Sequence, residues 1–383
     1  MSALTPDLVR DTLRQVQDPD LHKDIVSLGF VTKAEVSGGT VDVTINLTTP
    51  ACPVKDQMKA QAEDLIRALP GVTTVNVEMT AVPTASSGPP RNVAPDIRHI
   101  VAISSGKGGV GKSTVTVNLA CALAKTGAKV GILDCDVYGP DIPMMMGLGG
   151  EPETYGKKLV PKERHGVKTM SIGYLLPDDK PVIWRGPMVH KLIEQFLADV
   201  EWGALDYLLV DMPPGTGDAQ LSLAQIVPLT GAVLVTTPQA VSAYDVSKAI
   251  AMFNQVNVDI LGIVENMAGY VVKGQVAGAG AGTTVTIDTG LRTEKTSTDA
   301  EGNFESVVHM FGQGGAERLA EKYNFQVIGR VPLNPAVRVG GDGGDPVTVT
   351  DPNSRIAHEF GEVAGRFAQK VAISAHKELP VFQ

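Results

Sequence analysis

A glycine-rich loop with two lysines and two hydroxyl residues carries the most specific chemistry in this chain. The loop, residues 106–114, reads Gly-Lys-Gly-Gly-Val-Gly-Lys-Ser-Thr and lies between an apolar run at 100–103 and a helical pattern at 115–123. This order of strand, loop and helix predicts a phosphate site, because backbone N–H groups and the positive end of the helix dipole surround the phosphate oxygens. Lys112 is expected to reach the β- and γ-phosphates, and the Ser113 hydroxyl to bind Mg²⁺. The predicted nucleotide-binding residues of the loop are Gly106, Lys107, Gly108, Gly109, Val110, Gly111, Lys112, Ser113 and Thr114.

Lys107 distinguishes this loop from the common form of the motif. With Lys107 directly after the first glycine, the string resembles the deviant Walker A motif of the MinD, ParA and arsenite-pump class of P-loop ATPases. In that class the extra lysine reaches the partner's nucleotide, so the resemblance implies a homodimer with two ATP molecules between its subunits. A second ammonium at the γ-phosphate would neutralise charge that develops in phosphoryl transfer. Lys107 and Lys112 are therefore candidate catalytic residues, with a solvated loop lysine as the alternative for Lys107.

Three aspartates follow or end predicted apolar strands. Asp134 and Asp211 each end such a strand, and Asp136 lies two residues beyond the first of them. Carboxylates at the carboxyl ends of strands in an open α/β sheet lie beside bound phosphates. By resemblance to the P-loop class, Asp136 orients the attacking water, while Asp134 and Asp211 join Ser113 around Mg²⁺ through water. Gly215 then belongs to switch II, where its backbone N–H can approach the γ-phosphate without a clashing side chain.

Longer strings around these residues are typical of one family. The string D-x-D-x-Y-G-P-x-I-P at 134–143, W-R-G-P-M at 184–188 and E-N-M at 265–267 resemble the Mrp/ApbC family of iron–sulfur cluster carrier ATPases. The resemblance implies Mg²⁺-dependent hydrolysis of ATP to ADP and phosphate, and delivery of clusters to apoproteins. It also implies that Asn266 reads the adenine through its amide group and that Pro332 borders the base.

Residues 1–80 predict a small α+β domain, with helices at 4–16 and 54–69 and strands at 31–36, 41–47 and 72–79. Its T-x-x-x-C-P loop at 48–53 and its acidic turn at 18–20 resemble the small domain of iron–sulfur assembly factors. Cys52 precedes the second helix, whose dipole would favour a thiolate there. A small buried residue is the equal alternative, and one cysteine cannot complete a metal site alone.

The remainder predicts a linker and a larger domain. Residues 81–95 are rich in Pro, Ser and Gly without an apolar period, which indicates a flexible linker. Residues 96–383 then hold the ATPase domain. Strands are expected at 129–134, 205–211, 232–237, 260–267 and 325–331, with a C-terminal helix at 356–371. Repeated β-α units of these lengths predict an α/β fold with a doubly wound, mostly parallel sheet.

The family pattern is interrupted after the E-N-M string. In Mrp/ApbC proteins a C-x-x-C pair follows, and two subunits each donate that pair to a cluster. Here Val272 and Gln275 occupy the cysteine positions, and neither side chain can ligate iron as a thiolate does. Residues 276–302 are rich in Gly, Ala and Thr, which predicts a mobile or hairpin-like insertion.

Composition excludes several classes of function. The 383 residues are 43% hydrophobic and 20% charged, as in globular proteins of two or three domains. The net charge of −9 argues against a nucleic-acid partner, and the absence of a long apolar stretch argues against a membrane. There is no signal-peptide pattern, and the three cysteines are widely spaced. We therefore expect a cytoplasmic protein.

Two functions remain open from the sequence. The chain is either an ATP-hydrolysing homodimer that binds or delivers iron–sulfur clusters, with Cys52 as the candidate ligand, or a cluster-free dimer switch that recruits a client protein. The missing C-x-x-C favours the switch. The resemblance of residues 1–80 to assembly factors favours the carrier.

Overall fold

The structure is a computed structural model that describes residues 4–18, 23–47, 54–80, 94–175, 186–290 and 292–377. The chain forms two compact units. The first is Met1–Pro90 with Thr126–Ala128 and Gly365–Gln383, and the second is Arg91–Lys125 with Lys129–Ala364. The linker predicted at 81–95 lies almost wholly outside the described residues, so the domain boundaries at 80 and 95 stay predictions.

The N-terminal unit has the predicted α+β composition. Its elements are α1 (Pro6–Leu13), β1 (Gln17–Asp18), β2 (Lys23–Asp24), β3 (Val31–Ser37), β4 (Thr40–Asn46), α2 (Lys55–Arg67) and β5 (Thr74–Thr80). The sheet order is β3-β4-β5, with β3 antiparallel and β5 parallel to β4. The first helix is shorter than predicted. It starts after Thr5, whose hydroxyl accepts a hydrogen bond from the Leu8 N–H at 3.2 Å and caps the helix.

The second unit is built on a nine-stranded sheet. Its strands are β6 (Ile97–Ser105), β7 (Val130–Asp134), β10 (Lys162–Arg164), β11 (Val167–Ser171), β12 (Leu205–Asp211), β13 (Gly231–Thr236), β14 (Ile260–Gln275), β17 (Asn303–Val308) and β18 (Val327–Leu333). The order is β10-β11-β7-β12-β6-β13-β14-β17, with β18 also paired to β14. Pairing is parallel from β11 through β18, while β10 and β17 are antiparallel. The doubly wound, mostly parallel sheet is therefore confirmed.

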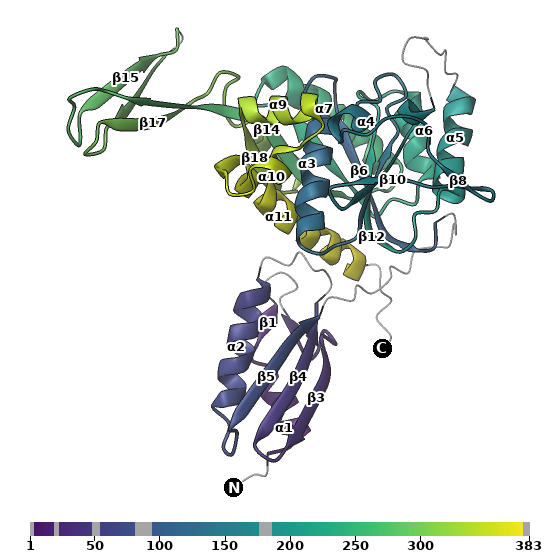
Figure 1. Cartoon of the computed structure of the whole chain (residues 1–383), viewed down its shortest axis with the longest axis vertical. Helices are drawn as coiled ribbons and strands as arrows, with labels where there is room; N and C mark the ends of the chain where they lie inside the picture. The colour runs from purple at the N-terminus through teal and green to yellow at the C-terminus, as the bar shows by residue number, and fades with distance from the viewer. Residues whose placement is uncertain are drawn as a thin grey trace. The chain divides into compact units, whose positions relative to one another are not determined.

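Helices cover both faces of this sheet (Figure 1). They are α3 (Lys112–Lys125), α4 (Ile142–Met145), α5 (Gly186–Asp199), α6 (Asp218–Ile226), α7 (Ala240–Gln255), α8 (Gly315–Tyr323), α9 (Pro335–Gly343), α10 (Val347–Thr350) and α11 (Arg355–Lys377). Helices α5 to α8 contact one another in succession, and α3, α4, α9 and α10 contact one another in a second group. Every residue of β7 and β13 is buried, as expected for strands that are covered on both faces.

Strand β14 continues well beyond the predicted end at residue 267. After an irregularity between Asn266 and Tyr270 it runs to Gln275 and pairs antiparallel with β17. With the hairpin of β15 (Thr284–Asp288) and β16 (Thr293–Ser297) it forms an arm that projects from the second unit (Figure 1). The hairpin-like insertion is confirmed. Val272 pairs with Ser306 inside this ladder, so the positions of the family's C-x-x-C lie in a β-strand here.

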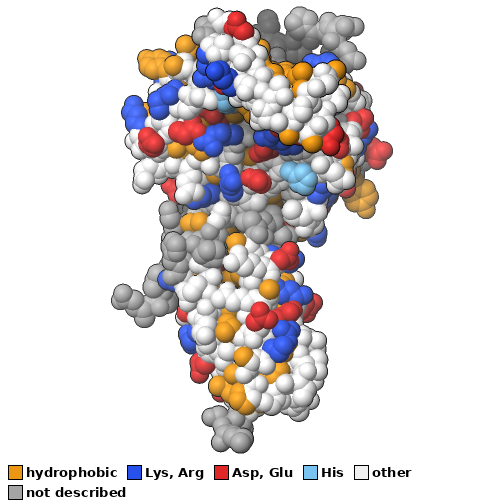
Figure 2. Space-filling view, turned by 90° about the vertical axis from the view of Figure 1, so that its left-hand side faces the viewer, with side chains coloured by type: hydrophobic (Ala, Val, Ile, Leu, Met, Phe, Trp, Pro, Cys, Tyr) orange, Lys and Arg blue, Asp and Glu red, His pale blue; other side chains and the backbone are white. Residues whose placement is uncertain are grey.

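Among the described helices, none combines the length and the apolar character that a bilayer crossing requires. On the face drawn in Figure 2, acidic and basic side chains are interspersed over the surface.

A buried histidine in β6 predicts acid sensitivity of the second unit. His99 is 4% exposed and its ring stacks on Tyr207 with 5.8 Å between centroids. Burial, followed by the charge of Arg98, lowers the pKa of His99 to about 4 from 6.5. The unfolded chain therefore binds a proton between these pH values that the folded chain does not, so stability is complete above pH 6.5 and is lost as the pH falls toward 4. We expect a loss of about 2 kcal/mol between pH 7 and pH 5 from this group.

The measurement is urea unfolding at both pH values, followed by tryptophan fluorescence. The two tryptophans, Trp184 and Trp202, both belong to the second unit, so the signal reports that unit. The variant His99→Phe keeps a ring against Tyr207 and should lose about 2 kcal/mol less than the wild type between the two pH values. An equal loss in both proteins would contradict the assignment.

Candidate nucleotide-binding site

Three neighbouring strands deliver the polar residues to one edge of the sheet. Strand β12 lies between β7 and β6, and Asp211 at its end pairs in register with Asp134 on β7 and Ile103 on β6. The glycine loop connects β6 to α3, which starts at Lys112. The carboxyl ends of the strands and the N-terminus of the helix therefore meet, as the sequence predicted.

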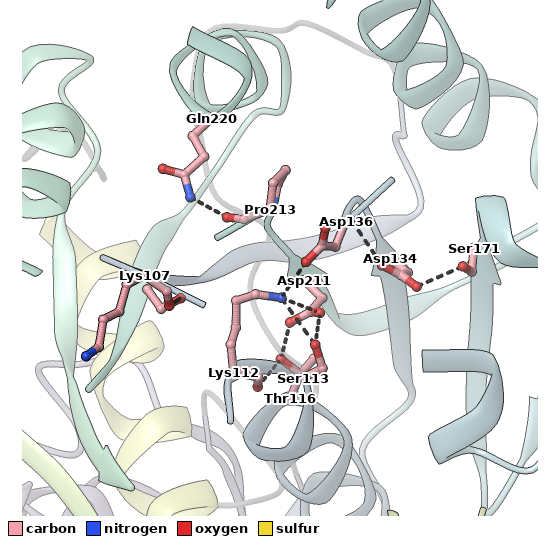
Figure 3. A network of polar contacts seen from close by, with 11 residues as sticks. Lys107, Lys112, Ser113, Thr116, Asp134, Asp136, Ser171, Asp211, Pro213 and Gln220 are labelled. Atoms are coloured by element: carbon pink, nitrogen blue, oxygen red, sulfur yellow. Dashed lines mark hydrogen bonds and ion pairs between the residues drawn. The ribbon is translucent and has the colours of Figure 1, made fainter. Parts of the chain in front are cut away.

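The predicted lysine, serine and aspartate form one hydrogen-bonded cluster (Figure 3). Lys112 Nζ lies 2.6 Å from Asp211 Oδ2, and the Ser113 hydroxyl donates to the same oxygen at 2.7 Å. Lys112 is only 6% exposed and Asp211 is fully buried. Lys112 Nζ also lies 3.8 Å from Asp136 Oδ2, so one ammonium serves two of the predicted carboxylates.

Thr116 is a member of this cluster that the sequence analysis missed. Its hydroxyl donates to Asp211 Oδ1 at 2.7 Å, so both oxygens of that carboxylate accept hydrogen bonds from α3. Thr116 follows Lys112 by four residues and thus lies on the same helix face. That spacing was the available signal for Thr116.

The two aspartates of the D-x-D string at the end of β7 lie in different environments. Asp134 Oδ2 accepts from the Ser171 hydroxyl at 2.8 Å, and its Oδ1 accepts from the backbone N–H of Asp136 at 3.0 Å. Asp134 therefore stabilises the start of the loop that follows β7, and these hydrogen bonds do not go to the glycine loop. Asp136 Oδ1, in contrast, is buried and has no hydrogen-bond partner among the described residues. Ser171 comes from β11, and nothing in the local sequence pointed to it. Cys135 between the aspartates is fully buried and belongs to the core.

Burial and mutual repulsion control the charges of the cluster. Burial raises the pKa of Asp134 well above its usual range, and the negative charge of Asp211 raises it further. Burial also raises the pKa of Asp136, although the nearby Lys112 acts in the opposite direction. For Lys112, burial lowers the pKa, but Asp211 and the other carboxylates outweigh it and leave the pKa raised. Lys112 is therefore the cation on which this acidic cluster depends.

At two positions of the loop only glycine fits, because neighbouring atoms lie where a side chain would begin. A Cβ on Gly106 would lie 2.2 Å from the carbonyl carbon of Asp245 at α7, and a Cβ on Gly111 would lie 2.2 Å from Asn266 Nδ2. Asn266 itself donates to the Val110 carbonyl at 2.8 Å and is buried. The residue predicted to read adenine thus lies against the loop, but β14 does not end there. A Cβ on Gly109 would meet nothing within 4 Å, and one on Gly108 would meet only Pro214, at 3.9 Å, which leaves room beside the loop.

Lys107 and Gly215, the residue predicted to belong to switch II, are arranged differently from Lys112 and Ser113. In Figure 3 the Lys107 side chain points away from the cluster around Lys112. The Gly215 N–H donates to the Ser105 carbonyl at 3.2 Å, so this amide is engaged by β6. Gln220 on α6, also missed from the sequence, donates through Nε2 to the Pro213 carbonyl and so joins α6 to the segment that follows β12.

The donor set fits a nucleotide and a magnesium ion. Hydroxyl and carboxylate oxygens are the ligands that Mg²⁺ prefers, and Ser113 Oγ and Asp211 Oδ2 lie 2.7 Å apart. Asp136 Oδ1 at the same edge is buried without a hydrogen-bond partner in the described part of the chain, and it supplies an acceptor for a water. The start of α3 provides backbone N–H groups that have no partner within the helix. Thr114 belongs to this first turn, and Pro332 lies half-buried on β18.

Two of the three cysteines lie in the part of the chain that the structure describes. Cys52, Asp20 and the motif at 184–185 lie outside the described residues. Cys121 on α3 and Cys135 are buried; burial raises the pKa of Cys121 to about 12 and that of Cys135 well above its usual range. The described residues contain no group of three or more His, Cys, Asp and Glu side chains suited to hold a metal ion.

A glycine loop between a strand and a helix, with the helix lysine and a strand-end aspartate beside it on a doubly wound sheet, defines a P-loop nucleoside triphosphatase. The chain belongs to the family described as NUBPL iron-transfer P-loop NTPase, which matches residues 96–281 and 295–368. Residues 6–78 match a second family, described as iron–sulfur cluster assembly protein. These matches confirm the resemblance to carrier ATPases and to the assembly-type small domain.

Relatives support this membership over the whole chain. An iron–sulfur cluster carrier protein of Synechocystis is 45% identical over 378 residues, which cover 97% of this chain and 99% of the relative. A protein of the same description from Deinococcus radiodurans is 43% identical over 376 residues, with 98% of each chain covered. Among solved structures, a nucleotide-binding protein from Archaeoglobus fulgidus in complex with ADP is 38% identical with a TM-score of 0.53, covering 70% of this chain and 93% of its own.

Proposed function

We propose that this protein is a Mg²⁺-dependent ATPase that works as a homodimer and carries iron–sulfur clusters to apoproteins in the cytoplasm. The cluster formed by Lys112, Ser113 and Asp211 carries the ATPase part of the proposal. The cargo rests on the relatives, which are described as iron–sulfur cluster carrier proteins over nearly the full length of this chain. These relatives do not favour the cluster-free switch.

Each residue of the site receives a role from its position. The loop amides and Lys112 bind the phosphates, with Lys112 exchanging its contact to Asp211 for one to the γ-phosphate. Asp136 orients the attacking water through Oδ1, which has no partner among the residues that the structure describes. Ser113 and Asp211 would hold Mg²⁺, which supplies positive charge against the phosphate oxygens. The base would lie toward Asn266 and Pro332, and Gly215 would turn its N–H from Ser105 to the γ-phosphate.

Lys107 is the residue that supports the dimer. Its side chain points away from the cluster of its own subunit, as a lysine that serves a partner's nucleotide must. In the proposed dimer the two loops face each other, and each Lys107 neutralises charge on the other subunit's ATP.

The candidate cluster ligand follows by elimination among three cysteines. Cys121 and Cys135 are buried with raised pKa values, so neither is available as a thiolate. Cys52 is the remaining thiol of the chain. In the dimer, two copies of Cys52 supply two ligands. An iron–sulfur cluster is held by four thiolates, so a client or a small molecule must supply the others. We expect a labile cluster, as suits a carrier.

Anaerobic reconstitution with iron and sulfide tests the carrier function. The wild type is expected to bind iron with a visible thiolate-to-iron charge-transfer absorbance, and Cys52→Ala is expected to lose both the absorbance and the bound iron. Cys121→Ala is the matched control and should retain them, since Cys121 is buried in α3.

Two outcomes would contradict the proposal. Absence of a cluster in the wild type together with intact ATP hydrolysis would reject the carrier function and support the cluster-free switch. Retention of the full cluster in Cys52→Ala would place the ligands elsewhere.

A further inference from the structure

Arg164, on the edge strand β10, makes an unusual set of hydrogen bonds for a residue outside the nucleotide site. Its Nη1 lies 3.2 Å from the carbonyl oxygens of Met146 and Gly147 and 3.0 Å from that of Gly344. Its Nη2 donates to Asp345 Oδ1 at 2.8 Å. One guanidinium therefore joins two segments that are about 200 residues apart in the chain, a task for which its planar fork of five donors is suited.

The two segments touch so closely that only glycine fits between them. A Cβ on Gly344 would lie 2.2 Å from Gly147 Cα, and both glycines have positive φ, +76° and +61°. His165 adds a further contact, with Nε2 3.2 Å from the Gly344 carbonyl. The junction of residues 146–147 with 344–345, which we call the Arg164 clamp, is thus a defined packing contact between α4 and α9.

Both segments of the Arg164 clamp are continuous in the chain with residues of the proposed nucleotide site. Residues 146–147 end the short helix α4, which starts a few residues after Asp136. Residues 344–345 follow α9, which starts at Pro335 behind the proposed base-binding end of β18. The same segment continues to Thr348, whose N–H and hydroxyl lie 3.4 and 3.3 Å from Asn118 Oδ1 on the P-loop helix.

We propose that Arg164 is a positioning residue for ATP hydrolysis: by clamping the end of α4 to the end of α9, it fixes the loop that carries Asp136 relative to the base side of the site. This inference rests on the proposed function, in which Asp136 orients the attacking water and β18 lies beside the base. Arg164 touches no reacting group. Its removal should therefore misplace the water-orienting carboxylate without removing a nucleotide contact.

The kinetic test compares Arg164→Ala with a matched arginine. We expect kcat to fall between about 10- and 100-fold, because a displacement of 1 Å at a reacting group costs that order of rate, while KM for ATP stays unchanged. Arg338→Ala is the control, since Arg338 lies on α9 but is exposed and bonds only to Asp342 among the described residues. It should leave kcat unchanged. Gly344→Ala keeps the arginine but forces the segments apart, and it should lower kcat as Arg164→Ala does.

Amide hydrogen exchange tests the clamp without hydrolysis. The Gly147 and Asp345 N–H groups donate at 2.9 Å to Met144 and Gly340, and both should exchange faster in nucleotide-free Arg164→Ala than in the wild type. If the wild type does not hydrolyse ATP but these amides still exchange faster in Arg164→Ala than in the wild type, the clamp is supported while the proposed function is rejected. Unchanged exchange, an unchanged kcat, or a kcat loss matched by an equal loss of nucleotide-binding capacity would overturn the proposal.

Discussion

Replacing Lys112 with alanine should abolish ATP hydrolysis, lowering kcat/KM by roughly 10³-fold or more, because it removes a cation from the developing charge of the phosphates. The same change should destabilise the nucleotide-free protein by about 3 kcal/mol. Lys112 Nζ lies 2.6 Å from Asp211, which is fully buried beside Asp134 and Asp136. Among the described residues, Lys112 is the cation that acts on these carboxylates, so its removal leaves them uncompensated. Phosphate release and urea unfolding measure the two effects.

A second variant separates stability from activity. Adding Asp211→Asn to Lys112→Ala removes the uncompensated charge, so the double variant should regain much of the lost free energy of unfolding but no hydrolysis. Lys107→Ala, in contrast, should leave the stability of the protomer unchanged, since its side chain points away from the cluster. Near-normal hydrolysis by Lys112→Ala would show that the glycine loop is not the catalytic site.

The glycine loop shows what a sequence can predict about a site. The phosphate motif is contiguous, so the strand, the turn and the helix that form it are encoded within about twenty residues. The register of β12 with β7 was also accessible, because Asp134 and Asp211 both end apolar strands and parallel strands share one edge. The meeting of Lys112 with Asp211 followed from these two facts.

The contacts that were missed depend on pairing between distant segments. Ser171 reaches Asp134 only because β11 is placed beside β7, and a buried strand has no local signal for its neighbour. The extension of β14 to Gln275 has the same origin, since its partner β17 starts at Asn303, beyond the hairpin. The Arg164 clamp joins residues that no local pattern connects.

Replacing Asp136 with asparagine should lower kcat by about 10² to 10⁴-fold while ATP binding is retained, because the side chain orients water and binds no phosphate in our proposal. The free oxygen Oδ1 supports this role, since it is buried without a partner among the described residues. Burial raises the pKa of Asp136, so the active carboxylate is lost as the pH falls through that raised value. The acid limb of the wild-type pH–rate profile should therefore lie above the usual range of an aspartate, and Asp136→Asn should lack it.

Two matched variants decide whether orientation or charge explains the loss. Asp136→Glu keeps the carboxylate but moves it by one methylene, so it should restore the acid limb and only part of kcat. Asp141→Asn removes an exposed carboxylate from the same loop and should leave kcat and nucleotide affinity near the wild type. A loss of ATP affinity in Asp136→Asn as large as its loss of kcat would instead assign Asp136 to nucleotide binding, because an interaction made only in the transition state leaves binding unchanged.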